Sequence, residues 1–352
     1  MENTSFPLSE LDYTTYNYTD EDEESTYSSI DNIVKILNII LYSIIFILGT
    51  TGNGLVIWIA GFKMQKTVSV LWFLNLAIAD FVFDISFPLL ITELIMDGHW
   101  PFGNTMCKVV FTILFLNMSV STSFLMIISV DRCIAIMCPV WSKNHKSPKL
   151  ATTISAIIWT TCFMLSSPYF AFYEMVHYGD NETSITYCIP AYADDDNDKQ
   201  IMRDQIMIIV RLISMFLVPF SIIVICYSLI VFRLRRSRSL SKSNRPLKVI
   251  VTIVLCFFCF WFPFHVWPLL EIMNVELDYT VDFIMSHLVY TIGFFNSCVN
   301  PIVYVFVGRD FKKTFFKSIP FLLENTLKEK NVSETEPRFE ETMMETEMEG
   351  YD

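Results

Sequence analysis

The sequence predicts an all-α membrane protein: a seven-transmembrane helix bundle with a short amphipathic eighth helix. Of its 352 residues, 53% are hydrophobic and 15% are aromatic, and the mean hydropathy is +0.44. The apolar residues stand in long blocks, and a block of about 20 residues spans a bilayer as a helix. No strand-like alternation predicts a barrel, so helices are the remaining way to cross the membrane.

The apolar blocks define the order of the elements. Seven spans are predicted, at residues 34–60, 68–94, 105–137, 150–173, 205–233, 247–273 and 283–307. Before this bundle (34–307), the acidic segment 1–33 is expected to be a disordered extracellular tail with no cleaved signal peptide. After it, we expect an amphipathic juxtamembrane helix at 308–320 and a disordered cytoplasmic tail at 321–352.

Lys and Arg are distributed unequally between the two sides of these spans. With the N-terminus outside, the outer side carries five of the 25 basic residues: Lys35, Lys108, Lys199, Arg203 and Arg211. The others face the cytoplasm and concentrate at 232–248 and 308–313. Because basic loops stay on the cytoplasmic side, we expect a multi-pass plasma-membrane protein with an extracellular N-terminus and a cytoplasmic C-terminus.

The net charge of −12 is concentrated on the outer side. The outer tail holds nine acidic residues before its first basic residue, Lys35, and the outer segments 192–199 and 271–282 are also acidic. Such a field attracts a cationic ligand; an acidic tail that only keeps a disordered segment solvated is the alternative. Tyrosines among these acids are candidates for sulfation: Tyr13, Tyr16, Tyr18 and Tyr27.

Two cysteines and three asparagines are predicted to be modified on the outer side. Most of the nine cysteines fall within spans, where Cys behaves as a small hydrophobe. Cys107 and Cys188 lie where a disulfide is chemically permitted, and a bridge between them would hold the loop after the fourth span over the bundle. N-x-S/T sites predict glycosylation at Asn3, Asn17 and Asn181.

Polar residues inside the spans are costly and therefore indicate function. Asp80 stands in the middle of the second span, and polar residues fall at similar depth in spans one, three and seven: Asn53, Asn117, Ser121, Asn296, Ser297 and Asn300. Their oxygens could hold a small hard cation or a water cluster; a polar network that only joins helices is the alternative. Asp84, one turn further out, is expected to be only partly buried.

Five spans contain a proline that weakens the helix locally: Pro88, Pro168, Pro219, Pro263 and Pro301. Trp261 stands just before one of them, so a rotating aromatic switch and simple core packing are both open. In the fifth span, Arg211 interrupts the apolar run "IIVRLIS". Its charge either reaches the membrane surface along its aliphatic stem or meets a partner inside the bundle.

Enzyme and transporter classes are disfavoured by what the sequence lacks. It contains no H-E-x-x-H or G-x-S-x-G motif, and its five histidines are not clustered at metal-ligand spacing. No two homologous halves with paired broken helices are visible, as a transporter would need. Lipid is the expected surrounding, and no nucleic-acid partner is expected.

The ordered motifs resemble those of rhodopsin-like (class A) G-protein-coupled receptors over residues 34–320. They are "GN" (52–53), "LNLAIAD" (74–80), Cys107 with Cys188, "DRC" (131–133), Trp159, Pro219 with Tyr227, "FWFP" (260–263) and "NPIVY" (300–304). Within that family, further stretches resemble the chemoattractant subgroup of formyl-peptide, chemerin and anaphylatoxin receptors: "KTVSVLWFLNLAIADF" (66–81), "HWPFG" (99–103), "DRCIAIMCPVWSKNH" (131–145), "NRPLKVI" (244–250) and "FFNSCVNPIVYVFVGRDFKK" (294–313).

The resemblance implies a role for each matching residue. Asp131 would hold Arg132 at rest and release it toward a G protein, usually of the inhibitory type. The other residues of activation would be Tyr227, Phe257, Trp261, Pro263, Pro301 and Tyr304. No cofactor is implied other than an allosteric Na+, held by Asp80, Asn117, Ser121, Asn296 and Asn300. Arrestin would bind after phosphorylation among the tail glutamates, at Ser333, Thr335, Thr342 and Thr346; an acidic, merely solvated tail is the alternative.

The resemblance also implies a ligand and a pocket. The ligand would be a chemoattractant peptide or small basic protein that drives chemotaxis and inflammatory responses, and it would contact Glu93, Leu114, Phe115, Arg211, Trp261, His265 and Tyr290. Related receptors that bind peptide ends share an arginine at the place of Arg211, whose guanidinium suits a carboxylate. Formyl-peptide receptors have an aspartate where Phe115 stands, which favours a chemerin- or anaphylatoxin-like ligand. A formyl-peptide receptor and a non-signalling scavenger remain the alternatives.

Overall fold

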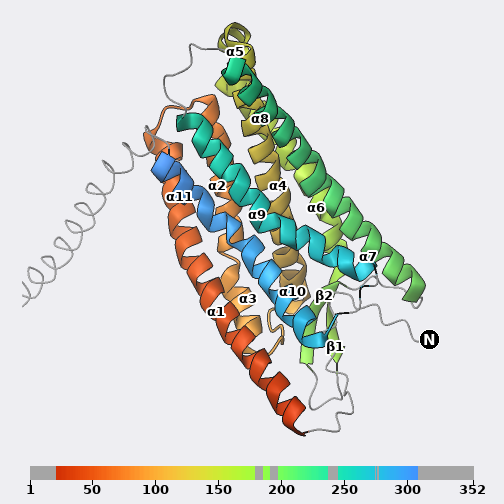
Figure 1. Cartoon of the computed structure of the whole chain (residues 1–352). Helices are drawn as coiled ribbons and strands as arrows, with labels where there is room; N and C mark the ends of the chain where they lie inside the picture. Colours follow the sequence, from red (N-terminus) through yellow and green to blue (C-terminus); the bar gives the residue numbers. More distant parts are fainter. Residues whose placement is uncertain are drawn as a thin grey trace, which may run out of the picture. The chain divides into compact units, whose positions relative to one another are not determined.

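The computed structural model describes residues 21–178, 185–190, 197–236, 245–273, 275 and 277–307. The described residues up to Val303 form one compact unit, which holds the helical bundle except for the last residues of α11 (Figure 1). In chain order, the elements before the hairpin are α1 (Glu21–Trp58), η1 (Ile59–Lys63), α2 (Val68–Asp84), α3 (Phe87–Ile95), α4 (Gly103–Met137), α5 (Pro139–His145) and α6 (Pro148–Phe172). The remaining ones are β1 (Tyr173–Tyr178), β2 (Ile185–Pro190), α7 (Asn197–Arg211), η2 (Leu212–Leu217), α8 (Val218–Arg236), α9 (Arg245–Ile272), α10 (Tyr279–Phe294) and α11 (Asn296–Val307).

Each predicted span falls on helix in the described part of the chain. Five helical stretches are long and apolar enough to cross a membrane: Ser28–Lys63, Val68–Ile95, Gly103–Met137, Pro148–Phe172 and Ile201–Arg233. The sixth prediction matches α9, which contains the shorter apolar stretch Phe258–Leu270, and the seventh matches α10 and α11. The expected eighth helix at 308–320 lies outside the described residues.

The first helix begins earlier than expected. α1 starts at Glu21, so residues 21–33, which were predicted to belong to the disordered tail, are helical. Four acidic residues open this helix (Glu21, Asp22, Glu23 and Glu24). Negative charge at a helix N-terminus is favourable because the first free N–H groups carry partial positive charge. Residues 1–20 and 321–352 lie outside the described part.

α4 occupies the centre of the bundle, where it packs against α2, α6 and α8. Its buried face carries small polar residues, among them Ser119, Ser121, Thr122 and Ser129. Small side chains let helices approach closely, which is how helices associate when lipid removes the hydrophobic driving force. Large apolar side chains on α6, such as Ile157, Phe163 and Met164, are instead exposed, as expected for a lipid-facing surface.

The prolines distort their helices, and local groups compensate for some of the freed carbonyls. Pro88 follows a break between α2 and α3, and Pro219 follows the π-helical segment η2. Pro301 cannot donate to the carbonyl of Ser297, four residues earlier; Asn53 Nδ2 donates to that carbonyl over 3.1 Å. Pro168 likewise frees the carbonyl of Met164, which accepts from Ser167 Oγ at 2.8 Å. α9 contains a second proline, Pro268, in addition to Pro263.

Candidate functional site

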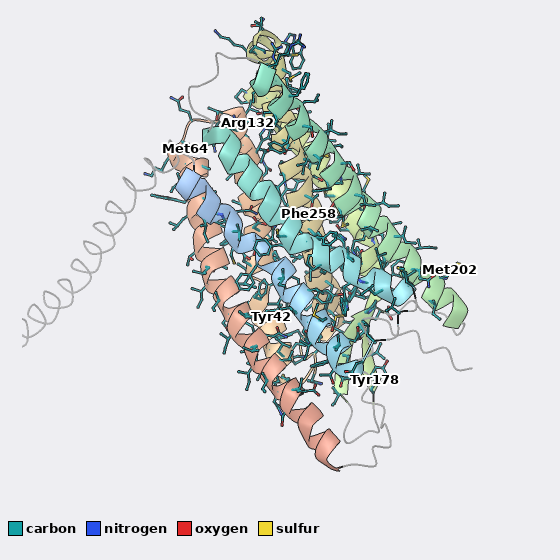
Figure 2. The ribbon with its side chains drawn as sticks, viewed as in Figure 1. Tyr42, Met64, Arg132, Tyr178, Met202 and Phe258 are labelled. Atoms are coloured by element: carbon teal, nitrogen blue, oxygen red, sulfur yellow. A yellow bond between two sulfur atoms is a disulfide. The ribbon has the colours of Figure 1, made fainter. Side chains whose placement is uncertain are left out.

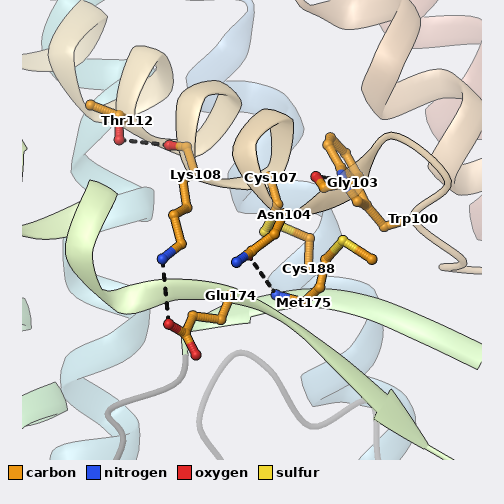
Figure 3. Close-up of a disulfide and its surroundings, with 9 residues drawn as sticks. All are labelled: Trp100, Gly103, Asn104, Cys107, Lys108, Thr112, Glu174, Met175 and Cys188. Carbon is orange, nitrogen blue, oxygen red and sulfur yellow. Dashed lines mark hydrogen bonds and ion pairs between the residues drawn. A yellow bond between two sulfur atoms is a disulfide. The ribbon is translucent and has the colours of Figure 1, made fainter.

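A β-hairpin covers the end of the bundle at which α4 begins, here called the disulfide end. β1 and β2 pair antiparallel, with Met175 opposite Cys188. The predicted bridge between Cys107 and Cys188 is present, which ties β2 to the first turns of α4 (Figure 3). The predicted bridge is therefore confirmed, whereas the hairpin was not predicted from the sequence.

Further contacts hold the hairpin against the helices. Lys108 Nζ forms an ion pair with Glu174 Oε1 at 3.3 Å, and the Met175 amide donates to Asn104 Oδ1 at 3.2 Å (Figure 3). The Trp100 amide donates to the Thr186 carbonyl at 2.7 Å. The hairpin is thus attached through both strands, so it forms a fixed wall at this end.

Arg211 lies inside the bundle and not at its surface. It is the last residue of α7, and only 6% of it is exposed. Its guanidinium carbon lies 5.0 Å from the ring centre of Phe264 and 5.6 Å from that of Phe115. The reading in which the side chain reaches the membrane surface is therefore wrong.

Aromatic residues from several helices surround this guanidinium. Phe115 of α4 stacks on Tyr169 of α6 with 3.5 Å between ring centres, and the Tyr169 hydroxyl is close enough to the guanidinium to interact with it electrostatically. Tyr173 and Tyr290 are close enough to interact with it electrostatically. Aromatic rings stabilise a cation through their faces, but they supply no negative charge.

The charge of Arg211 has no ion-pair partner within the described part of the chain. Its Nε and Nη2 groups are buried and make no hydrogen bond there. Asp204, two helical turns earlier on α7, acts on the guanidinium electrostatically without forming an ion pair. A buried cation with unused donors is costly, so this arrangement favours binding of an anionic group.

His265 adds a second set of unused polar atoms to the same region. It is almost fully buried on α9, its ring centre lies 5.0 Å from that of Phe216, and Arg211 acts on it electrostatically. Neither ring nitrogen has a hydrogen-bond partner in the described structure. Buried polar atoms are normally bonded, so we interpret Arg211 and His265 as one polar recognition surface within an aromatic wall.

Asp80 is the centre of the buried polar cluster in the middle of the bundle. Its Oδ1 accepts from Asn117 Nδ2 at 2.9 Å and from Ser121 Oγ at 3.0 Å, and its Oδ2 accepts from Asn300 Nδ2 at 2.8 Å. Asn296 is buried too, but its Nδ2 has no partner in the described structure. These side chains carry oxygens that a hard cation can use as ligands. In this structure, however, Asn117, Ser121 and Asn300 act as hydrogen-bond donors to Asp80.

Asp84 differs from its expected position. It is fully buried, not partly exposed. Asn53, expected to join Asp80, instead donates from Nδ2 to Asp84 Oδ2 at 2.9 Å. Depth along a helix does not decide which face a neighbouring helix covers, and α1 covers Asp84 here.

The residues 52–304 match the family model described as 7 transmembrane receptor (rhodopsin family). The chain belongs to this receptor family. The receptor is 41% identical over 322 residues to Chemerin-like receptor 1 of Sus scrofa, covering 86% of this chain and 88% of the relative. It is 42% identical over 289 residues to Chemerin-like receptor 1 of Homo sapiens (80% and 77% covered) and 36% identical over 310 residues to Formyl peptide receptor 2 of Mus musculus (86% and 88% covered).

Family membership confirms the seven-helix bundle and the multi-pass membrane protein predicted from the sequence. It also confirms that the chain is a receptor and not an enzyme. The inferred subgroup, chemoattractant receptors, agrees with the relatives' names.

The structure brings only part of the predicted ligand pocket of the receptor together. Phe115, Arg211 and His265 lie together, with Tyr290 beside the guanidinium and Trp261 at 6.4 Å from the His265 ring. Leu114 is buried next to Phe115 on α4. Glu93 is partly buried on α3 and acts electrostatically on Tyr42 of α1. Phe264, Tyr169 and Tyr173 were not predicted as site residues; their aromatic character alone could not distinguish them from core residues.

The opposite end of the bundle carries the Asp131–Arg132 motif (Figure 2). Arg132 was expected to be held by Asp131, but its Nη2 donates to Ser69 Oγ at 2.9 Å. Asp131 instead forms an ion pair with Lys146, whose Nζ lies 2.8 Å from the Asp131 carboxylate. The same Nζ donates a hydrogen bond to the Asp131 backbone carbonyl, also at 2.8 Å. Tyr227 is near enough to Arg132 for an electrostatic interaction.

The sequence did not predict this role of Lys146, because the residue lies beyond the motif, just after α5, and only the fold brings it to Asp131.

We expect Lys146→Met to free Asp131 for Arg132 and to lower basal nucleotide exchange about 2- to 5-fold, since a partly exposed ion pair contributes about 0.5–1 kcal/mol. Lys146→Arg is the control and should keep wild-type exchange. Unchanged exchange in Lys146→Met at equal surface expression would show that this ion pair has no part in coupling.

Several predicted sites lie outside what the structure describes. These are the side chains of Tyr27, Phe257 and Tyr304, the other candidate sulfation sites Tyr13, Tyr16 and Tyr18, the glycosylation sites Asn3, Asn17 and Asn181, and the phosphorylation sites Ser333, Thr335, Thr342 and Thr346. Pro263 lies inside α9 and Pro301 inside α11, where Pro301 borders Gly52 of α1. Their roles in activation stay predictions.

Proposed function

We propose that this receptor recognises an extracellular chemoattractant peptide or small basic protein through a carboxylate, which pairs with Arg211. The observation that carries the proposal is the buried guanidinium, whose Nε and Nη2 atoms have no hydrogen-bond partner and which has no carboxylate partner in the described structure. An Arg–carboxylate pair is directional and charge-assisted. The acidic outer tail would attract the basic remainder of the ligand.

A ligand resembling that of the chemerin-like relatives fits this surface better than a formylated peptide. The relatives include both chemerin-like and formyl peptide receptors. Phe115 lies 5.6 Å from the guanidinium and offers only an aromatic ring. A ring cannot accept the hydrogen bonds that a formylated end would donate, whereas it leaves Arg211 free for a carboxylate.

Signalling would follow from tighter binding of the ligand to the active state than to the resting state. We infer an extracellular N-terminus, coupling to inhibitory G proteins at the Arg132 end, later recruitment of arrestin by the phosphorylated tail, and an allosteric Na+ beside Asp80. The Asp131–Arg132 motif supports signalling over scavenging.

The deciding experiment is ligand-stimulated nucleotide exchange on an inhibitory G protein in membranes that contain the receptor. Basic peptides are compared as pairs with a free or an amidated C-terminus. We expect exchange with at least one acid peptide and a much weaker response to its amide. Internalisation of ligand without exchange would identify a scavenger instead, and equal responses to acid and amide would contradict carboxylate recognition.

Phe115→Asp should prevent Arg211 from binding the carboxylate of a ligand. The new carboxylate would stand opposite Arg211 and neutralise it, because the Phe115 ring already lies at 5.6 Å. We expect the potency of an acid peptide to fall about 10- to 100-fold, which corresponds to about 1.4–2.8 kcal/mol, with little change for its amide. Phe115→Leu is the control, and an equal loss in both variants would mean that packing matters, not charge.

A further inference from the structure

Thr186, the second residue of β2, joins the hairpin to residues 96–102, here called the α3–α4 connector. Its backbone N–H donates to His99 Nδ1 at 3.2 Å, and its carbonyl accepts from the Trp100 amide at 2.7 Å. Its hydroxyl lies 2.8 Å from Nδ1 of His177, the residue opposite it on β1. Two histidines of the disulfide end therefore contact the same buried residue.

The hydrogen bond from Thr186 fixes the protonation state of His99. A backbone N–H can only donate, so the Nδ1 atom that accepts from it must carry a lone pair. His99 makes this contact as a neutral ring, with its hydrogen on Nε2. A protonated ring carries hydrogens on both nitrogens, and its Nδ1–H would face the N–H of Thr186. The His99–Thr186 hydrogen bond therefore exists only while His99 is uncharged.

His177 does not have this restriction. Its partner is the Thr186 hydroxyl, and a hydroxyl both donates and accepts. The His177 ring can accept from the hydroxyl when it is neutral and donate to it when it is protonated. His177 is also exposed to solvent, whereas His99 is half-buried. Of these two histidines, only His99 loses its hydrogen bond to Thr186 on protonation.

The acidic residues beside the connector and on β1 are engaged in ion pairs. Asp97, two residues before His99, pairs with Lys35 of α1. Glu174 of β1 pairs with Lys108 of α4. Since each of these carboxylates has its own cation, neither compensates a positive charge on His99.

The other titratable groups on neighbouring elements do not compensate that charge either. Glu93 of α3 interacts with no histidine of the described residues. β2 carries no charged residue, and its Tyr187 ring fills the space beside Gly98 of the connector. His177 is the remaining group, and its protonation would add a like charge. A charged His99 is thus without a stabilising partner within the described residues.

Loss of the His99–Thr186 hydrogen bond would affect the hairpin on its connector side. The disulfide at Cys188 holds β2 on α4 independently of this bond. The first residue of β1, Tyr173, interacts electrostatically with Arg211. Because β1 contributes to the surroundings of Arg211, a loosened hairpin changes the wall of the proposed ligand pocket.

We propose that the His99–Thr186 hydrogen bond makes the hairpin pH-sensitive: it holds β2 on the α3–α4 connector at neutral pH and is lost in acid. Histidine is the side chain whose charge normally changes between about pH 5 and 8. The neutral ring is the form that bonds, so the contact is present above this range and disappears as the pH falls through it. The wall beside Arg211 would then be held less firmly.

The test uses the purified full-length receptor without a ligand. Hydrogen exchange of the Thr186 amide is measured at about pH 7.5 and about pH 5.5, on either side of the usual histidine range. Each rate is compared with that of the same amide in the unfolded receptor at the same pH, so that the protection factor reports local opening. We expect the protection of the wild-type amide to fall about 2- to 10-fold in acid, as for the loss of one hydrogen bond.

Three variants assign the change to one histidine. His99→Asn keeps an acceptor at the place of Nδ1 but cannot be protonated, so the Thr186 amide should stay protected at both pH values. His177→Asn is the matched control on the opposite strand, and it should show the full wild-type fall. His99→Leu removes the acceptor and should lower the protection at neutral pH to the level of the wild type in acid. It takes over the test if His99→Asn does not fold.

The proposal is wrong if the protection of the wild-type amide is the same at both pH values. It is also wrong if the fall persists in His99→Asn or His99→Leu, since another group would then titrate, or if His177→Asn abolishes it. None of these results bears on carboxylate recognition by Arg211, because no peptide is used.

Discussion

Arg211→Gln is expected to weaken the response to an acid peptide by roughly 30- to 700-fold while leaving the response to the matching amide nearly unchanged. Truncating one partner of a buried charge pair costs about 2–4 kcal/mol, and tenfold in affinity corresponds to about 1.4 kcal/mol. The structure explains the selectivity: Nε and Nη2 of Arg211 have no other partner in the described part of the bundle. The measurement is the concentration for half-maximal nucleotide exchange with each peptide of the pair.

The matched control for this variant is Arg203→Gln, on the same helix eight residues earlier. It removes the same charge about two helical turns from Arg211 on the same helix, and should weaken both peptides of a pair by the same small factor. If Arg211→Gln weakened acid and amide equally, the residue would support packing or folding instead of carboxylate recognition.

Removing the disulfide with Cys107→Ser and Cys188→Ser together is expected to lower the stability of the receptor by about 2–5 kcal/mol. The bridge closes a loop of 81 residues and anchors β2 to α4. Without it, the contacts that remain among the described residues include the Lys108–Glu174 pair, the stacking of Tyr173 on Phe111 and a few hydrogen bonds, each of which contributes about 1 kcal/mol. We expect ligand-stimulated exchange to be largely lost and the melting temperature to fall.

Cys162→Ser is the control for this experiment, because Cys162 is a free buried cysteine on α6 that faces Ser123. It should keep most of the exchange activity. A double serine variant with wild-type melting temperature and agonist potency would show that the remaining contacts hold the hairpin alone, and that the bridge has no functional part in the mature receptor.

The spans were predictable because the property that defines them is local. Hydrocarbon excludes any long segment that does not bond its own backbone, so the length and composition of an apolar block suffice. The breaks near Pro88 and Pro219 were predictable for the same reason, since a proline removes a hydrogen bond wherever it stands. The ordered motifs predicted the receptor family, which the family match confirms.

The sequence predicted less well which polar residues pair with one another. Asp84 was expected to be partly exposed and Asn53 to face Asp80, yet the two bind each other. Asp131 was expected to hold Arg132, yet it pairs with Lys146. In each case the competing partners stand at similar depth, and only the rotation of each helix and the room beside it, such as that left by Gly49, select one.

The sequence by itself determined the multi-pass membrane class, the approximate position of each span and the presence of a charged residue, Arg211, in an apolar segment. Only the tertiary structure decided what that charge meets: aromatic rings from α4, α6 and α9 and no carboxylate within the described residues. The physical reason is the range of the interactions. Insertion into lipid depends on a sum over neighbouring residues, whereas a hydrogen bond depends on ångström distances between residues far apart in the chain.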